Sequence, residues 1–279
     1  MVPLSDLMKY VEYIGDSRSF DPHFALAAPS RSALQAARSI CGCRRRPALI
    51  IHGIMPRSGT VYAGELLRRH LDLHAYPREI WEAPLLQLAG DVDELQAKFL
   101  WAHRHNVGKL GERDFLPLLG AAFLRYLSTS VADDKRMLLK VPGVHHLSDF
   151  FTMFPYENLL VLVRDGRDVV HSTVQTWPVI MFWMACLRWR RSARMVLACD
   201  EHWGTGEAPP NRTNPAAKNT NRRAQRRLFT AARRAQPKGQ LSPAPSSARP
   251  LTAASGPSSR GGYWLARFED AVADPEGFV

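Results

Sequence analysis

The feature that most constrains the fold is the apolar run NLLVLV at residues 158–163. A strand with one solvent-exposed face alternates apolar and polar side chains, whereas successive apolar residues are typical of a strand covered on both faces. The run ends at the charged sequence RDGRD, and a helix is expected to follow through Val169 and Val170. Such strands occur in parallel sheets that have helices on both faces.

Short apolar runs alternate with amphipathic stretches along most of the chain. Besides residues 158–163, strands are predicted over residues 48–51, 136–141 and 263–268. Helices are predicted over residues 59–71, 115–127 and 179–198, with two more beginning near residues 91 and 269. The alternation predicts a three-layer α/β fold with a parallel sheet and flanking helices.

The chain carries a formal charge of +11, but this charge is concentrated in one segment. Residues 204–262 contain eleven Lys and Arg residues, one acidic residue and eight of the twenty prolines. Few large aliphatic residues are available there to offset chain entropy, so we predict a disordered basic insertion. Residues 1–47 are expected to form a partly helical N-terminal extension, and residues 48–203 and 263–279 the α/β domain.

The composition excludes several classes of protein. With 46% hydrophobic residues and four cysteines in 279 residues, the chain is not a collagen-like protein, a wholly disordered protein or a small secreted protein stabilised by disulfides. No apolar run approaches the roughly 20 residues that a membrane-spanning helix needs, and the first residues do not read as a signal peptide. We therefore expect a cytoplasmic protein, or a Golgi-lumenal one if an N-terminal anchor precedes this sequence.

The turn after the first strand reads GIMPRSGT, residues 53–60. A strand, a glycine-containing loop and a helix N-terminus form a cradle for phosphate, because the first amides of a helix point outward unpaired. A nucleotide triphosphate loop would carry Lys directly after the second glycine, but Thr60 follows Gly59 here. A P-loop nucleotide kinase therefore stays only as an alternative.

The PRSGT loop resembles that of sulfotransferases that use 3′-phosphoadenosine-5′-phosphosulfate (PAPS). In that family the loop binds the 5′-phosphosulfate end of the donor. The resemblance implies that Arg57 neutralises the leaving phosphate, while Ser58, Gly59 and Thr60 wrap it. Tyr62 stands where cytosolic members carry a tryptophan that stacks on adenine.

A second motif, VRDGRDVVHS at residues 163–172, resembles the 3′-phosphate motif of the same family. Arg164 and Ser172 have the spacing of the Arg at a strand end and the Ser on the following helix. A guanidinium offers forked hydrogen bonds to phosphate. Arg167 and Asp168 fit better as solvated surface residues. A weaker match, RFED at residues 267–270 followed by ADP at 273–275, is expected to organise the edge of the sheet.

The resemblance also suggests catalytic residues. Lys140 matches a lysine near the sulfuryl group, and no metal is expected because Arg and Lys supply the positive field. Four residues remain candidates for the catalytic base: Glu79, Glu82, His145 and His146. We favour Glu79, since an acidic residue downstream of the loop acts as the base in the carbohydrate and tyrosylprotein branches of the family. Arg57 and RDGRD also favour those branches, or the bacterial type, over the cytosolic one.

The resemblance thus implies transfer of a sulfuryl group from PAPS to a hydroxyl or amine of a glycan, a peptide tyrosine or a small metabolite, with adenosine 3′,5′-bisphosphate (PAP) as product. Family members usually continue past the point where this chain stops, so a truncated C-terminus is also expected. The remaining alternative is an inactive fragment or binding module whose insertion contacts polyanions.

Overall fold

The computed structural model describes residues 17–42, 46–75, 82–103, 110–132, 134–178, 180–204 and 261–278. Almost all of the predicted basic insertion, residues 205–260, lies outside these ranges, as do residues 1–16. The predicted disorder of the insertion and its contact with polyanions therefore stay predictions.

Five parallel strands form one sheet in the order β2-β3-β1-β4-β5. The strands are β1 (Leu49–Gly53), β2 (Leu73–Ala75), β3 (Arg136–Val141), β4 (Asn158–Val163) and β5 (Tyr263–Arg267). The predictions for β3 and β4 are confirmed over their full lengths. The edge strand β2 was not predicted, because three residues are too few to show a period.

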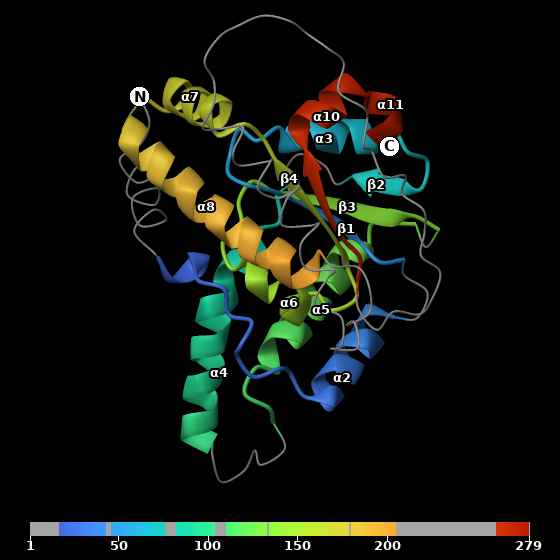
Figure 1. Cartoon of the computed structure of the whole chain (residues 1–279). Helices are drawn as coiled ribbons and strands as arrows, with labels where there is room; N and C mark the ends of the chain where they lie inside the picture. The colour runs from blue at the N-terminus through green and yellow to red at the C-terminus, as the bar shows by residue number, and fades with distance from the viewer. Residues whose placement is uncertain are drawn as a thin grey trace, which may run out of the picture. The chain divides into compact units, whose positions relative to one another are not determined.

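Helices cover both faces of the sheet (Figure 1). They are α2 (Arg31–Cys41), α3 (Thr60–Leu67), α4 (Ala89–His103), α5 (Phe115–Ser128), α6 (Phe150–Met153), α7 (Gly166–Thr176), α8 (Phe182–Trp203), α10 (Phe268–Ala273) and α11 (Pro275–Phe278), with 3₁₀ turns η1 (Arg18–Phe20), η3 (Pro84–Leu88) and η4 (Leu147–Asp149). In the described part of the chain, no helix combines the length and apolar character needed to cross a membrane.

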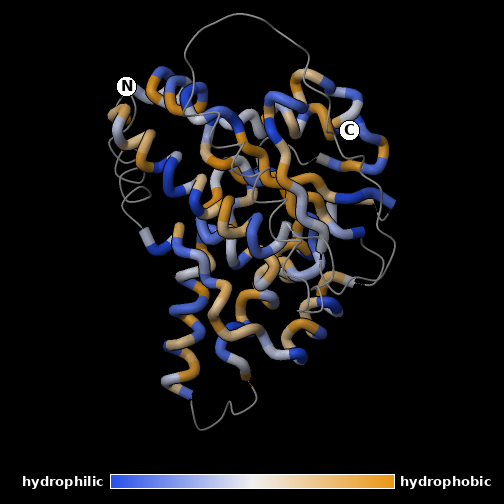
Figure 2. The backbone as a smooth tube through the Cα atoms, in the orientation of Figure 1, coloured by the Kyte–Doolittle hydropathy of each residue, from blue (hydrophilic) through white to orange (hydrophobic). Residues whose placement is uncertain are grey.

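Alternate side chains of each strand enter two separate cores. On one face Ile51, Leu160 and Leu162 pack against Ala63 and Leu67 of α3. On the other face, strand residues join a larger core whose helical members come from α4, α5, α6, α7 and α8. Hydrophobic residues accordingly gather along the strands (Figure 2), and the three-layer α/β architecture is confirmed.

The strand order creates a switch point at the carboxyl ends of β1 and β4. From β1 the chain runs through α3 to β2 on one side, whereas from β4 it runs to β5 on the other. The two strands are neighbours up to Gly53 and Leu162. In open parallel sheets, ligands bind in the crevice at such a point.

Candidate functional site

The predicted phosphate loop lies at this switch point, between β1 and α3. The Ile54 N–H donates to the Leu162 carbonyl oxygen at 3.0 Å and so ties the loop to β4. Ser58 closes the loop on itself: its N–H donates to the Met55 carbonyl oxygen at 3.2 Å, and its hydroxyl oxygen accepts from the Met55 N–H at 3.1 Å. The Ser58 side chain is fully buried, so it shapes the loop from inside.

Two residues of the loop have left-handed backbone conformations. Arg57 has φ 75° and Gly59 has φ 89°. A Cβ at Gly59 would lie 2.2 Å from the ring of Phe268, so both the φ angle and the space require glycine. An arginine held at positive φ stores local strain of about 1–3 kcal/mol, a feature that clusters at ligand sites.

The loop leads directly into exposed backbone donors at the start of α3. The first helical bond runs from the Ala63 N–H to the Gly59 carbonyl oxygen at 3.0 Å. The N–H groups from Thr60 to Tyr62 therefore have no acceptor one turn earlier in the helix. Such groups favour an anion at this end of the helix.

The structure brings the two predicted phosphate motifs together, although they are more than 100 residues apart. The Nε of Arg57 donates to the Ser172 hydroxyl oxygen at 3.0 Å. The Nη1 of Arg164 donates to the Arg57 carbonyl oxygen at 3.2 Å. Two guanidinium groups, a hydroxyl and the N-terminus of α3 thus share one end of the sheet.

Arg164 is held by the groups around it but keeps an unused donor. Its guanidinium lies 4.8 Å from the ring centre of Phe268 and 3.7 Å from the Asp168 carboxylate. Its Nε makes no hydrogen bond with any described residue. A buried donor of this kind is satisfied when an acceptor such as a phosphate oxygen binds.

Phe268 is a site residue that the sequence reasoning missed. Its ring meets Tyr62 edge-on at 5.6 Å, in addition to its contacts with Gly59 and Arg164. From its sequence, the RFED segment was expected only to organise the edge of the sheet. The available signal was the aromatic residue directly after β5, since β5 borders β4 and its carboxyl end lies beside that of β4.

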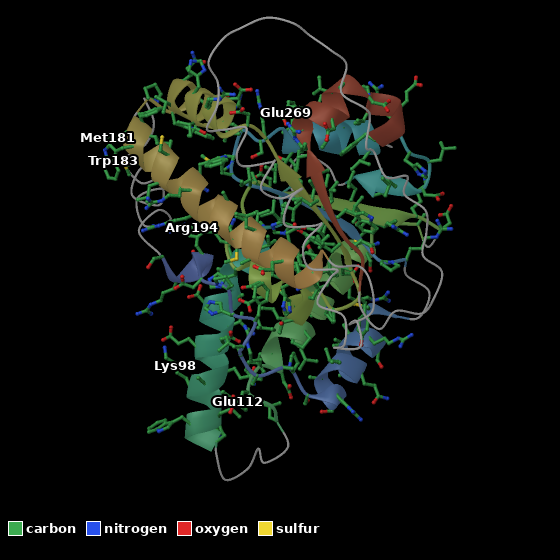
Figure 3. All side chains as sticks on the ribbon, viewed as in Figure 1. Lys98, Glu112, Met181, Trp183, Arg194 and Glu269 are labelled. Carbon is green, nitrogen blue, oxygen red and sulfur yellow. The ribbon has the colours of Figure 1, made fainter. Side chains whose placement is uncertain are left out.

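Arg167 and Asp165 form an ion pair at the surface, just after the carboxyl end of β4. The Nη2 of Arg167 lies 2.8 Å from the Asp165 carboxylate, and the Arg167 side chain is 78% exposed. The Asp165 N–H donates to the Glu269 carboxylate at 2.9 Å. Glu269 lies at the start of α10 (Figure 3). The Arg167 guanidinium and the Asp165 carboxylate thus neutralise each other within the turn.

Lys140 lies at the end of β3, on the face covered by α3, and is almost completely buried. Its ammonium nitrogen is 2.7 Å from the carboxylate of Glu82, which is half exposed. The Ala83 N–H donates to the Lys140 carbonyl oxygen at 3.1 Å and fixes this segment beside the strand. Glu79, the favoured base, lies outside the described residues.

The two remaining candidates for the base, His145 and His146, are both buried. The His145 ring packs against Phe20 with centroids 4.5 Å apart, and the His146 Nδ1 lies 3.4 Å from the Asp149 carboxylate. Both imidazoles therefore face the N-terminal segment and η4. This burial makes them poor candidates for contact with an acceptor from solution.

His52 in β1 supports the loop that follows β3. Its Nδ1 is 2.8 Å from the Gly143 carbonyl oxygen, and its Nε2 makes no hydrogen bond with any described residue. The ring meets Phe150 edge-on at 5.8 Å. Burial lowers the pKa of His52 to about 4, despite the bond to Gly143, which raises it. The imidazole is therefore neutral at pH 7 and donates from Nδ1.

This pKa predicts a pH-dependent loss of stability. The unfolded His52, with a pKa near 6.5, takes up a proton more readily than the folded one, so stability is complete above pH 6.5 and falls toward pH 4. The expected loss is about 3 kcal/mol, measured by urea unfolding between these pH values. His52→Asn keeps a donor for Gly143 without titrating, and its curve should be flatter; parallel curves for the two proteins would refute the assignment.

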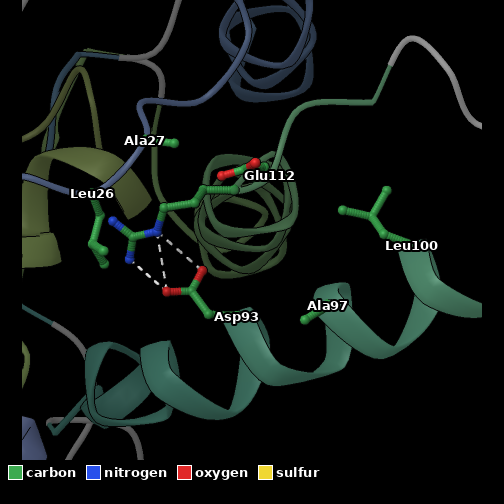
Figure 4. A pocket seen from close by; sticks show the side chains of 7 residues that line it. Leu26, Ala27, Asp93, Ala97, Leu100 and Glu112 are labelled. Carbon is green, nitrogen blue, oxygen red and sulfur yellow. Dashed lines mark hydrogen bonds and ion pairs between the residues drawn. The ribbon is translucent and has the colours of Figure 1, made fainter. Parts of the chain in front are cut away.

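A cavity of about 290 Å³ opens elsewhere, beside α4. Its lining includes the apolar residues Leu26, Ala97 and Leu100 (Figure 4). Arg113 also lines it and binds the Asp93 carboxylate. None of the predicted site residues lines it.

Comparison with known proteins gives no relative. No family model, no curated protein and no solved structure matches the chain. The function is therefore inferred from the residues at the carboxyl ends of β1 and β4 themselves.

Proposed function

We propose that the chain is a sulfotransferase that takes PAPS as donor. The observation that carries the proposal is the meeting of Arg57, Arg164 and Ser172 at the switch point, from two segments that each resemble a phosphate-binding motif of that family. A nucleotide with phosphate at both its 3′ and 5′ positions needs two cationic anchors close together. Arg57 and Arg164, which are in contact, offer two such anchors.

Each part of the donor has a proposed partner. Arg164 and Ser172 bind the 3′-phosphate, which takes over the hydrogen bond that Ser172 now accepts from Arg57. Arg57 and the first amides of α3 then bind the 5′ leaving phosphate, while Ser58 keeps the loop in shape. Tyr62, which is 39% exposed, and Phe268 offer aromatic surfaces to adenine.

The reaction forms a bond between the acceptor oxygen or nitrogen and sulfur, and breaks the bond between sulfur and the bridging oxygen of the 5′-phosphate. That oxygen leaves with PAP and carries negative charge, which Arg57 stabilises. Lys140 stabilises charge on the transferring group. The acceptor proton goes to a carboxylate, for which we propose Glu79 or Glu82 over the buried histidines; Glu82 already contacts Lys140.

Transfer of labelled sulfate tests this function. Full-length chain is incubated without magnesium with PAPS labelled in its sulfuryl group, against glycans, tyrosine peptides and small alcohols or amines. We expect label on one acceptor class and a loss of about 100-fold or more in Lys140→Met, because the charge near the transferring group is removed. Equal transfer by wild type and Lys140→Met would contradict the role of Lys140, and no transfer to any class would count against the function.

A further inference from the structure

A second group of polar side chains lies on the other side of the sheet from Lys140. His23 of the N-terminal segment, His146 of the loop after β3 and Asp149 of η4 each direct one potential ligand atom into the same space, within 4.8 Å of one another. His146 and Asp149 are buried, and His23 is partly exposed. The proposed sulfuryl transfer uses none of these residues.

The distance between His146 and Asp149 matches two ligands of one metal ion. The Nδ1 of His146 lies 3.4 Å from the Asp149 Oδ2, and this buried Nδ1 makes no hydrogen bond with any described residue. Zinc binds His nitrogen and carboxylate oxygen at about 2.0–2.2 Å in a tetrahedral arrangement, which places the two ligands about 3.4 Å apart. The pair is thus spaced for coordination and poorly directed for a hydrogen bond.

The buried ligands are fixed by their neighbours. Arg113 binds the other oxygen of Asp149 at 2.8 Å and leaves Oδ2 turned toward His146. The His146 backbone is left-handed, with φ 53°, and its N–H donates to the Ser19 carbonyl oxygen at 2.7 Å. Gly90 makes room for the ring, since a Cβ there would lie 3.1 Å from the His146 Cε1. Such supporting contacts are typical of metal sites.

His23 completes the set from a different part of the chain. Its N–H donates to the Ser148 hydroxyl oxygen at 3.1 Å, which holds its backbone beside η4. The rings of His23 and His146 lie 6.1 Å apart with planes 24° from parallel. Its ligand nitrogen lies within 4.8 Å of the ligand atoms of His146 and Asp149.

We propose that His23, His146 and Asp149 bind a divalent transition-metal ion, Zn²⁺ by preference, with water in the fourth position. Two imidazoles and one carboxylate form a ligand set that zinc accepts. The bound ion would join the segment at His23 to the loop after β3, which are more than 120 residues apart in sequence. Because it stabilises only the folded chain, the ion would raise the melting temperature.

Calorimetric titration of the metal-stripped full chain with ZnCl₂ tests the site. We expect one site per chain with a Kd of micromolar or tighter, and at least a tenfold weakening in His23→Ala. His103→Ala is the matched control, because His103 is an exposed histidine on α4 outside the cluster, and its affinity should equal that of wild type. Equal weakening in both variants, or no saturable binding to the wild type, would overturn the proposal.

Cobalt provides a readout that a simple His146–Asp149 ion pair would not give. Co²⁺ added to the stripped chain should produce the visible absorption of a four-coordinate site, which Zn²⁺ then abolishes by displacement. The melting temperature should rise with Zn²⁺ in wild type and His103→Ala but not in His23→Ala. A Co²⁺ spectrum identical to that of the aqueous ion would show that the three residues are only an ion pair with a neighbouring ring.

Discussion

Replacement of Arg164 by alanine is expected to weaken the binding of PAP by about 100-fold. The Arg164 guanidinium offers charge-assisted hydrogen bonds to the 3′-phosphate, worth about 1.5–3 kcal/mol each, and 1.4 kcal/mol corresponds to a factor of ten in affinity. The Arg164→Ala variant also lacks the hydrogen bond to the Arg57 carbonyl oxygen, which connects β4 to the loop between β1 and α3. The measurement is a calorimetric titration of each full-length protein with PAP, without magnesium.

Arg167→Ala is the matched control for this experiment. It removes a positive charge three residues away, but the Arg167 side chain is exposed and paired with Asp165. Its affinity should stay within about twofold of wild type, since exposed ion pairs contribute little. Equal losses in the two variants would mean that only net charge attracts the nucleotide. Binding of ATP that requires magnesium would favour the nucleotide-kinase alternative.

Replacement of Arg113 by leucine is expected to lower the free energy of unfolding by about 3–5 kcal/mol. Arg113 is buried and binds two carboxylates, those of Asp93 and Asp149. Burial alone would raise the pKa of Asp149, but its contacts with His146 and Arg113 hold the pKa below the usual value, so the group is charged. Without the guanidinium a buried carboxylate loses its main partner, which is costly.

The control is Lys98→Ala on the outer side of α4 (Figure 3). Lys98 also forms an ion pair, with Glu94 at 2.6 Å, but both side chains are mostly exposed. This variant should change stability by less than about 0.5 kcal/mol. Urea unfolding without added metal gives both values. A loss below 1 kcal/mol in Arg113→Leu would show that the buried network contributes little.

The architecture could be predicted because burial of a strand on both faces leaves a clear pattern of apolar residues in the sequence. A strand covered on both faces must be apolar at successive positions, so NLLVLV located β4 to the residue. Helix ends were less certain: α3 ends at Leu67 and not at residue 71, and α8 begins at Phe182 and not at residue 179. Apolar periodicity continues past the point where tertiary contacts end a helix.

The site could be predicted only in part, because three-dimensional contacts decide what each side chain does. Motif spacing selected Arg57, Arg164 and Ser172, and the strand order brought them together. Spacing could not show that the Ser58 hydroxyl turns inward, nor that Phe268 returns to the loop. The approach of His23 to Asp149 carries no sequence signal, since their separation matches no metal-binding motif.

The proposed function requires that a nucleotide with two phosphate-bearing ends binds at the carboxyl ends of β1 and β4. A crystal structure of the chain with PAP tests it most directly. We predict the 3′-phosphate within hydrogen-bond distance of Arg164 and Ser172, and the 5′-phosphate at the N-terminus of α3 beside Arg57. A nucleotide bound away from these residues, or no nucleotide bound there at saturating PAP, would contradict the proposed function.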